Sequence, residues 1–234
     1  KVAWNPGSVG TIQLDTGGTL ETGGLFSSFD NLKGTGTINT HGLVSDVDLV
    51  FDSQASLTRS WSLTGIDQNI TLNLNVDGTG SLGAGFSGSG TLRISDGMTV
   101  ASTYGYLAAK SGSSGEATVT GAGSQWNNSS DLLVGLSGSG TLNVESGGVV
   151  SNTYGYIGDQ LGSTGLATVT GSGSQWNSSS ELYVGHLGNG TLNVEAGGLV
   201  SNTTGIIGFE SGSTGIATVT GEGSQWNNSD QLQV

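Results

Sequence analysis

Short stretches in which apolar and polar residues alternate recur along the whole chain, and Gly, Ser and Thr separate them. Within residues 141–158 three such stretches follow one another, at 141–145, 149–152 and 154–158. Alternation of this kind over four or five residues is typical of a β-strand with one buried face. The pattern therefore predicts a chain built almost entirely from short strands joined by tight turns.

The same pattern returns at a constant interval through much of the chain. An aliphatic series has this spacing (Ile94, Val119, Val144, Val169, Val194 and Val219), and so does a glycine series (Gly90, Gly115, Gly140, Gly165, Gly190 and Gly215). A constant interval of this size predicts one backbone coil per repeat, with coils stacked about 4.8 Å apart. We therefore predict an all-β fold, a right-handed parallel β-helix with three strands and about 25 residues in each coil.

The repeat is strict in one region and degenerate in another. Residues 88–234 follow a 50-residue unit that contains two coils, and the last unit is truncated at the C-terminus. Residues 1–87 keep only the alternation, at irregular spacing. We expect irregular coils in residues 1–87 that continue into the regular coils of residues 88–234, forming one rod of about nine or ten coils.

Asparagine follows the same interval in the second half of the chain (Asn127, Asn152, Asn177, Asn202 and Asn227). If the coils keep a constant spacing, these amides lie above one another and hydrogen-bond along the stack. We predict a structural ladder inside a coil corner, where the amides satisfy backbone groups. The alternative is an outward ladder that contacts another molecule.

The third strand of each coil has an apolar residue at a position that alternation places outside. With Leu182 and Val184 inside, Tyr183 points outward. The equivalent positions form a column (Tyr106, Leu133, Tyr156, Tyr183, Ile206 and Gln233). Because a contiguous apolar stripe on a surface marks a contact site, we predict binding by its first five members. A long loop over the stripe, or a bulge that reverses the strand, is the alternative.

Two other sets of residues are weaker candidates for binding. Tryptophan recurs in every second coil (Trp126, Trp176 and Trp226), and the rings would point outward and stack on sugars if the neighbouring asparagines point inward. Packing of partly buried tryptophans in the coil corners is the alternative. Asn and Thr alternate on the outer face of the first strand and can hydrogen-bond to a second molecule (Thr118, Asn143, Thr168, Asn193 and Thr218).

Charge limits the possible partners. The chain has a formal net charge of −13 and no cysteine, and all five Lys and Arg residues lie at or before Lys110. Nucleic acids and anionic lipids are therefore poor partners by long-range electrostatics. No apolar run approaches membrane-spanning length, so we expect no membrane insertion by these residues.

Candidate catalytic chemistry is sparse. Neither His41 nor His186 lies in a Ser, Cys or metal-ligand pattern. Asp46, Asp48 and Asp52 share one face of a strand, and grouped carboxylates serve both glycan-cleaving enzymes and calcium sites. No basic residue accompanies them, and calcium needs more oxygen ligands. We therefore predict no catalytic residue, no metal and no cofactor.

The repeats resemble a known protein family. The segment Ala117-Thr-Val-Thr-Gly-Ala-Gly-Ser-Gln-Trp-Asn127, its copies starting at Ala167 and Ala217, and Gly138-Ser-Gly-Thr-Leu-Asn-Val144 carry the resemblance. They are similar to passenger domains of Gram-negative type V autotransporters, especially the AIDA-like group of self-associating adhesins. The resemblance covers residues 88–234 and extends to the N-terminal third only in style.

This resemblance implies a function and a location. It implies a passenger domain at the cell surface, anchored to the outer membrane through a C-terminal barrel outside this sequence. Such a domain would mediate cell aggregation, biofilm formation or attachment, with identical molecules on neighbouring cells or host or matrix glycans and proteins as partners. Two alternatives stay open: a carbohydrate-active β-helix (a polysaccharide lyase, a hydrolase or a phage-type fibre) and a structural spacer that binds nothing.

Overall fold

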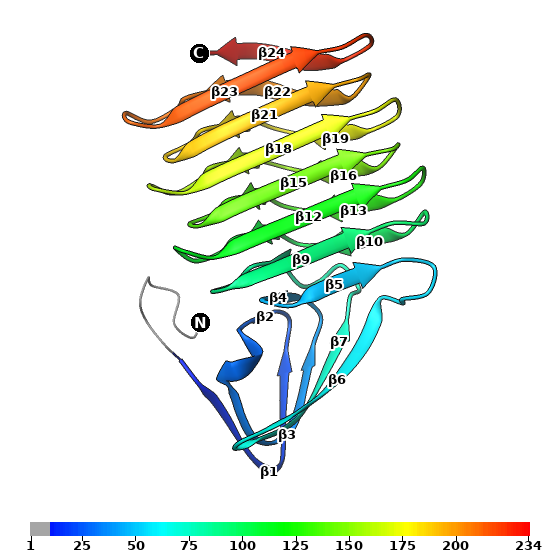
Figure 1. The fold of residues 1–234 in the computed structure, drawn as a ribbon, viewed down its shortest axis with the longest axis vertical. Coiled ribbons are helices and arrows are strands. Elements are labelled where there is room, and N and C mark those ends of the chain that lie inside the picture. Colours follow the sequence, from blue (N-terminus) through cyan, green and yellow to red (C-terminus); the bar gives the residue numbers. More distant parts are fainter. Residues whose placement is uncertain (1–9) are drawn as a thin grey trace.

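The computed structural model describes residues 10–234, which are almost entirely β-structure with one short 3-10 turn, η1 (Phe29–Asn31). The strands of successive coils are parallel and stack in columns (Figure 1). Three strand positions follow one another in each coil of the regular region. The predicted parallel β-solenoid, with one coil for each sequence repeat, is therefore confirmed. Within the described residues, no helix has both the length and the apolar character needed to cross a membrane.

The first strand position forms a seven-stranded sheet: β5 (Asp48–Phe51), β9 (Ser89–Ile94), β12 (Ser114–Thr120), β15 (Ser139–Glu145), β18 (Thr164–Thr170), β21 (Asn189–Glu195) and β23 (Thr214–Thr220). From β9 onward each strand pairs with the equivalent strand of the next repeat, as Gly115 does with Gly140. The predicted aliphatic and glycine series lie in register, and Val119, Val144 and Val169 are fully buried. This buried column forms one wall of the core.

The second and third positions share a 13-stranded sheet. The second position contains β10 (Thr99–Ser102), β13 (Gln125–Asn128), β16 (Val149–Asn152) and β19 (Gln175–Ser178). The third contains β2 (Leu25–Phe26), β4 (Leu43–Ser45), β8 (Leu82–Ala84), β11 (Gly105–Leu107), β14 (Leu132–Val134), β17 (Gly155–Ile157) and β20 (Leu182–Val184). Two longer strands run through both positions and join them: β22 (Leu199–Ile207) and β24 (Gln225–Gln233).

The N-terminal region is arranged differently from the regular coils. It contains a four-stranded sheet: β1 (Ile12–Thr22), β3 (Leu32–Thr40), β7 (Gln68–Asn75) and β6 (Thr58–Gly65), with β6 antiparallel to β7. Its strands run at a steep angle to the coils above (Figure 1). Ile12 pairs with Leu32 and Gly34 with Gln68, so the spacing of the regular coils is not kept here. The expectation of nine or ten coils is therefore too high. Residues 1–9 of the predicted irregular region lie outside the described residues.

Turn length alternates between coils and shifts the second strand. Four residues, 121–124, separate β12 from β13, whereas three residues, 146–148, separate β15 from β16. As a result Trp126 pairs with Val100, 26 positions earlier, and with Val150, 24 positions later. Because side chains alternate between faces, a shift of one residue exchanges the inner and outer sets.

The tryptophans consequently lie inside the rod. Trp126 and Trp176 are fully buried, in one column with Val100, Val150 and Val200. Trp226 in the last coil is partly buried and packs against the same core. The outward placement of the tryptophans is therefore wrong, and buried rings cannot stack on sugars.

The asparagine series splits into two columns for the same reason. The inner column contains Ser102, Asn128, Asn152, Ser178, Asn202 and Asn228, and the outer column contains Asn127, Ser151, Asn177, Ser201 and Asn227. Of the predicted ladder, only Asn152 and Asn202 are buried at this position. The prediction of a single inner ladder at a constant interval is wrong.

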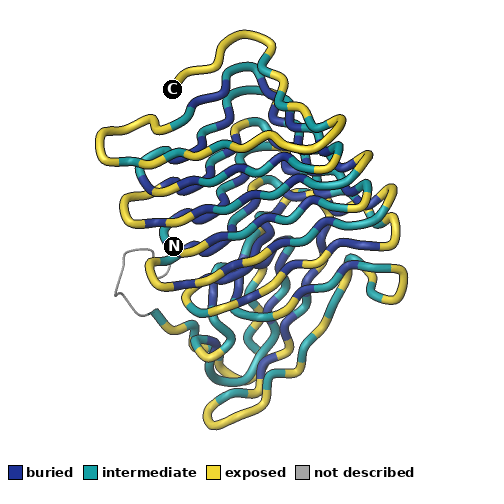
Figure 2. The backbone as a smooth tube through the Cα atoms, turned by 45° about the horizontal axis from the view of Figure 1, so that its top comes forward, coloured by how far each residue is buried: buried dark blue, intermediate teal, exposed yellow. Residues whose placement is uncertain are grey.

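The inner polar column satisfies its own hydrogen bonds. Asn152 Oδ1 accepts a hydrogen bond from Trp176 Nε1 at 2.6 Å, and Asn152 Nδ2 donates to Ser178 Oγ at 2.9 Å. Trp226 Nε1 donates to Asn202 Oδ1 in the same way, at 2.7 Å. Each of these indoles therefore has an acceptor from the preceding coil, which removes the cost of burying its N–H group. Figure 2 shows buried backbone along the coils and exposed backbone at the corners.

Candidate functional site: the tyrosine face

The predicted stripe on the third strand is in register. Tyr106 pairs with Leu133, Leu133 with Tyr156 and Tyr156 with Tyr183, and the column continues through Ile206 to Gln233. The inward neighbours Leu182 and Val184 are fully buried, so alternation places Tyr183 on the outer face, where it is partly exposed. This alignment agrees with the predicted column.

A glycine corner covers part of the stripe. Gly135 has φ +77°, and a Cβ there would lie 2.2 Å from the carbonyl oxygen of Thr164, so a larger residue does not fit. The corner turns the chain so that the next residue lies beside the outer face of the strand. Residues that follow the equivalent corners form a second column, whose backbones are hydrogen-bonded from coil to coil (Phe86, Ala109, Leu136, Asp159, His186 and Phe209). Five of them follow a glycine, and Ala109 follows Ala108, which also has a positive φ. Short corners, and not a long loop, therefore cover the stripe.

The half of the stripe nearer the N-terminus is a small second core. Tyr106 and Leu133 pack on a buried cluster outside the coils, formed by Val44, Phe86, Ala109 and Leu136. Ile206, nearer the C-terminus, retains only 7% exposure. Of the predicted binding residues, Leu133 and Ile206 therefore contribute more to packing than to an open surface.

The other half of the stripe is a cluster of aromatic rings. Tyr156 and Tyr183 stack with ring centroids 5.0 Å apart and an interplanar angle of 5°. His186 lies 5.0 Å from Tyr183 and stacks on Phe209 at 5.2 Å, while its Nδ1 lies 2.8 Å from Asp159 Oδ1. Stacking at the coil spacing holds the rings in fixed positions, so they form a preorganised surface.

A further column that the sequence reasoning missed lies beside the stripe. The residue before each third strand also points outward, and these residues alternate between Tyr and an acid: Tyr104, Asp131, Tyr154 and Glu181. Tyr104 and Tyr154 are 37% and 36% exposed. The Tyr-Gly-Tyr segments 104–106 and 154–156 could have revealed this column, because residues i and i+2 of a strand share a face.

All five tyrosines of the chain lie on this one surface. We call it the tyrosine face: Tyr104, Tyr106, Asp131, Leu133, Tyr154, Tyr156, Glu181, Tyr183, His186 and Phe209. Burial raises the pKa of Tyr106 and of Tyr156 to about 12, and the nearby Asp131 adds to both shifts. Burial likewise raises the pKa of Asp131, with a contribution from Asp159. These shifts share a cause, since burial disfavours the charged form of each group and neighbouring acidic groups add to the effect.

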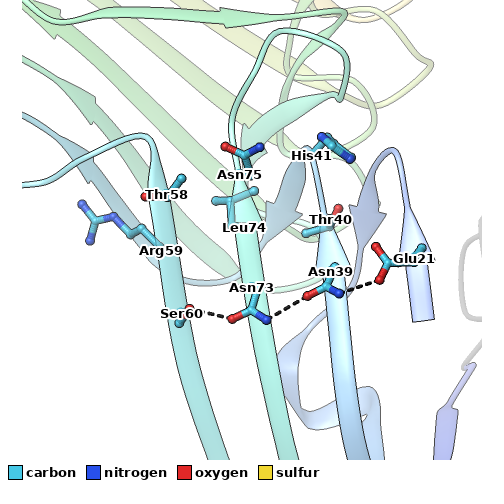
Figure 3. A pocket seen from close by; sticks show the side chains of 10 residues that line it. All are labelled: Glu21, Asn39, Thr40, His41, Thr58, Arg59, Ser60, Asn73, Leu74 and Asn75. Atoms are coloured by element: carbon cyan, nitrogen blue, oxygen red, sulfur yellow. Dashed lines mark hydrogen bonds between the residues drawn. The ribbon is translucent and has the colours of Figure 1, made fainter. Parts of the chain in front are cut away.

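A polar cleft lies at the other end of the molecule, on the four-stranded N-terminal sheet (Figure 3). Its volume is about 400 Å³. A row of hydrogen bonds crosses the sheet from Ser60 Oγ to Asn73 (2.6 Å), from Asn73 Nδ2 to Asn39 (2.8 Å) and from Asn39 Nδ2 to Glu21 (2.6 Å). Strand register places these four residues side by side, so the cleft presents a row of amide and carboxylate groups.

The acid–base groups in and beside this cleft already have hydrogen-bond partners. His41 Nδ1 lies 2.7 Å from Asp77 Oδ2, and hydrogen bonds from Thr79, with a smaller effect of His41, lower the pKa of Asp77 to about 2. Arg59 donates from Nη2 to the carbonyl oxygen of Val50, away from the cleft (Figure 3). Glu21 is the only carboxylate among the residues that line this described cleft. A glycosidase needs two carboxylates across the scissile bond.

The three aspartates of the predicted cluster accept hydrogen bonds from nearby turns and from the adjacent strand. Asp46 accepts hydrogen bonds from the backbone N–H groups of Ser87 and Gly88, and Asp48 accepts one from Thr91 Oγ1. Asp52 accepts two from its own turn. Across the part of the chain that the structure describes, no group of three or more His, Cys, Asp or Glu side chains is placed to hold a metal ion.

The Asn and Thr residues of the first strand are outward and in register. Thr118 pairs with Asn143, Asn143 with Thr168 and Thr168 with Asn193, and Thr218 completes the column. Asn143 Nδ2 donates to Glu116 Oε1 at 3.0 Å. This column is a flat polar surface on a different sheet from the tyrosine face.

Comparison with protein-family models, with curated proteins and with solved structures gave no match to this chain.

Proposed function

We propose that this chain is an adhesive rod, a surface-exposed β-helical module of the autotransporter-passenger type that binds its partners without catalysis. The observation that supports this proposal most is the tyrosine face, which continues over successive coils as a partly exposed aromatic strip. Weak contacts repeated along a rigid strip add to a useful overall affinity without any single strong site. Such a surface suits attachment, whether the result is cell aggregation, biofilm formation or adhesion to a host or matrix component.

The chemistry of the face also fits attachment. Tyrosine offers a large, rigid contact area with a polar tip and loses little conformational freedom on binding. Stacking already fixes Tyr156 and Tyr183, so binding there orders few side chains. Location at the cell surface is part of the proposal and is supported by the resemblance of the repeats in residues 88–234.

The carbohydrate-active alternative has one feature in its favour. The amide and carboxylate groups of Asn39, Asn73 and Glu21 in the polar cleft can hydrogen-bond to sugar hydroxyls. A glycan depolymerisation assay separates the two proposals, because an enzyme must release shorter products. Turnover by this chain that disappears in Glu21→Gln would establish the alternative.

The proposal is tested by displaying the chain on bacteria that do not clump and measuring settling and attachment. We expect Tyr156→Ser with Tyr183→Ser to abolish most of the attachment, because the change removes the stacked rings from the centre of the face. The matched control is Asn143→Ser with Asn193→Ser, which changes two outward residues on the first-strand sheet. We expect the control to attach like the unchanged chain.

Both double variants are checked first for an unchanged β spectrum and melting temperature. Full attachment by a folded tyrosine variant would remove this face from the proposal. Loss in the asparagine control alone would move the binding surface to the Asn and Thr column. A displayed, folded chain that attaches to nothing would support the spacer alternative.

A further inference from the structure

The tyrosine face carries negative charge from two carboxylates. Asp131 and Glu181 stand on it, and each accepts a side-chain hydrogen bond from the serine that precedes it, Ser130 or Ser180. In the described part of the chain neither carboxylate belongs to an ion pair. Residues 111–234 contain no Lys or Arg, and the histidine of the face, His186, is paired with Asp159. A carboxylate that is partly desolvated and has no cation beside it attracts one.

The aromatic rings favour the same type of ligand. The face of a tyrosine ring attracts a cation through its quadrupole, and Tyr104 and Tyr154 alternate with the two carboxylates along the rod. The chain itself contains one contact of this kind at the edge of the face: Lys110 Nζ lies 4.6 Å from the centroid of Phe86. A basic side chain on this surface can therefore meet both a ring and a carboxylate.

The spacing of these groups limits the shape of the ligand. Asp131 and Glu181 are two coils apart, as are Tyr104 and Tyr154, which corresponds to about 9.6 Å at the usual strand spacing. A polyproline II helix repeats every three residues and rises about 9.3 Å per repeat. Basic residues at every third position of such a segment would reach successive carboxylates from one side.

We propose that the tyrosine face binds an extended, basic polypeptide segment with Lys or Arg at every third position. The basic side chains meet Asp131 and Glu181, and the residues between them lie against the tyrosine rings. Aromatic grooves bind this conformation elsewhere because the ligand is extended before it binds and loses little entropy. The inference rests on the proposed adhesive function and names the class of partner, a heterologous cationic protein segment.

The test uses the purified chain and a fluorescently labelled peptide of Lys-Pro-Pro triplets, with binding followed by anisotropy. Three probes serve as comparisons: a peptide of Glu-Pro-Pro triplets, a peptide of the same composition with its lysines clustered at one end, and a neutral β-linked oligosaccharide. We expect the triplet Lys peptide to bind most tightly, and its affinity to fall as salt rises.

Variants identify the face. We expect Asp131→Asn with Glu181→Gln to weaken peptide binding by about three- to tenfold, the range for two exposed charge pairs. Tyr104→Ser with Tyr154→Ser should weaken it by a similar factor. The matched control is Glu145→Gln with Glu195→Gln, which removes the same two charges at the same two-coil spacing from the first-strand sheet and should leave binding within twofold.

Equal loss in the Glu145/Glu195 control would overturn the inference, because it would show attraction to net charge alone. Binding of the Glu-Pro-Pro peptide, or of the oligosaccharide in place of the Lys peptide, would overturn it as well. If cells still attach through Tyr156 and Tyr183 while the Lys peptide does not bind, the ligand class is wrong and the adhesive function stands. If the peptide binds but displayed cells never attach, the adhesive function is wrong and the ligand class stands.

Discussion

At the scale of single residues, neighbouring asparagines in this chain have opposite roles. Asn152 is buried and connects Trp176 to Ser178, whereas Asn177 lies on the outer face and accepts a hydrogen bond from Ser201 Oγ at 2.7 Å. Both belong to the same regularly spaced series. Their contributions to stability should therefore differ, since an unsatisfied polar group is costly only where water cannot replace the lost partner.

We predict that Asn152→Ala lowers the free energy of unfolding by about 1 to 3 kcal/mol, because the indole N–H of Trp176 loses its buried acceptor. Asn177→Ala, the matched control, should change it by less than about 0.5 kcal/mol. Urea denaturation of the two variants measures the difference. Equal destabilisation would contradict the assignment of inner and outer columns.

The tyrosine face should also show itself in alkaline titration. The pKa of Tyr106 and that of Tyr156 are about 12 in the folded chain, above the ordinary value of about 10. Because the folded state holds these protons more tightly, their contribution to stability is present below about pH 10 and is lost between about pH 10 and 12. We expect the melting temperature to fall in this window.

Ultraviolet absorbance of tyrosinate follows the titration directly, and Tyr156→Phe should remove part of the absorbance change near pH 12. The same variant should lose less stability than the unchanged chain between about pH 10 and 12, because it no longer carries that proton. A titration complete by pH 11 would show that these rings are solvated.

At the scale of elements, the length of the turns decides which side chains form the core. A four-residue turn precedes β13 and β19, which bury tryptophan, and a three-residue turn precedes β16 and β22, which bury valine. Each large ring thus lies between two smaller side chains, Val100 and Val150 in the case of Trp126. The alternation of large and small residues keeps the core densely packed at a constant coil spacing.

We predict that deletion of Ala122 shortens this turn to three residues and moves β13 by one position, which replaces Trp126 by Asn127 in the core. The loss should be about 3 to 5 kcal/mol, as for other removals of a buried aromatic side chain. Ala122→Gly keeps the turn length and is the control. Denaturant unfolding compares the two, and a deletion variant as stable as the control would show that the turn does not set the register.

At the scale of the whole molecule, the distribution of charge favours a heterologous partner. The net charge is −13, and every Lys and Arg lies at or before Lys110. Two such rods aligned side by side bring like charges together along their length. A cationic partner has no such opposition, which agrees with the ligand class inferred for the tyrosine face.

We predict that self-association of the purified chain is weakest at low salt and grows as salt screens the acidic surfaces. The screening length falls from about 30 Å at 0.01 M to about 8 Å at 0.15 M ionic strength. Light scattering at these two conditions measures the trend. Stronger self-association at the lower salt would show that attractive contacts between rods outweigh the repulsion.

The sequence by itself determined the solenoid, the first-strand core and the order of the third-strand column. Constant intervals and strict alternation are local properties, and Val119, Val144 and Tyr156 lie where these properties place them. The sequence also excluded a large basic surface formed by residues after Lys110, because no Lys or Arg follows that position.

The tertiary structure decided which side chains share a column when turn lengths differ. A change of one residue in a turn is almost invisible in so long a repeat, yet it placed Trp126 inside and Asn127 outside. The stacking of the coils also places Asp131 between Tyr104 and Tyr154, although a full coil of chain separates it from each tyrosine. The candidate site depends on these alignments, because hydrogen bonds between coils, and not spacing along the chain, fix which residues lie side by side.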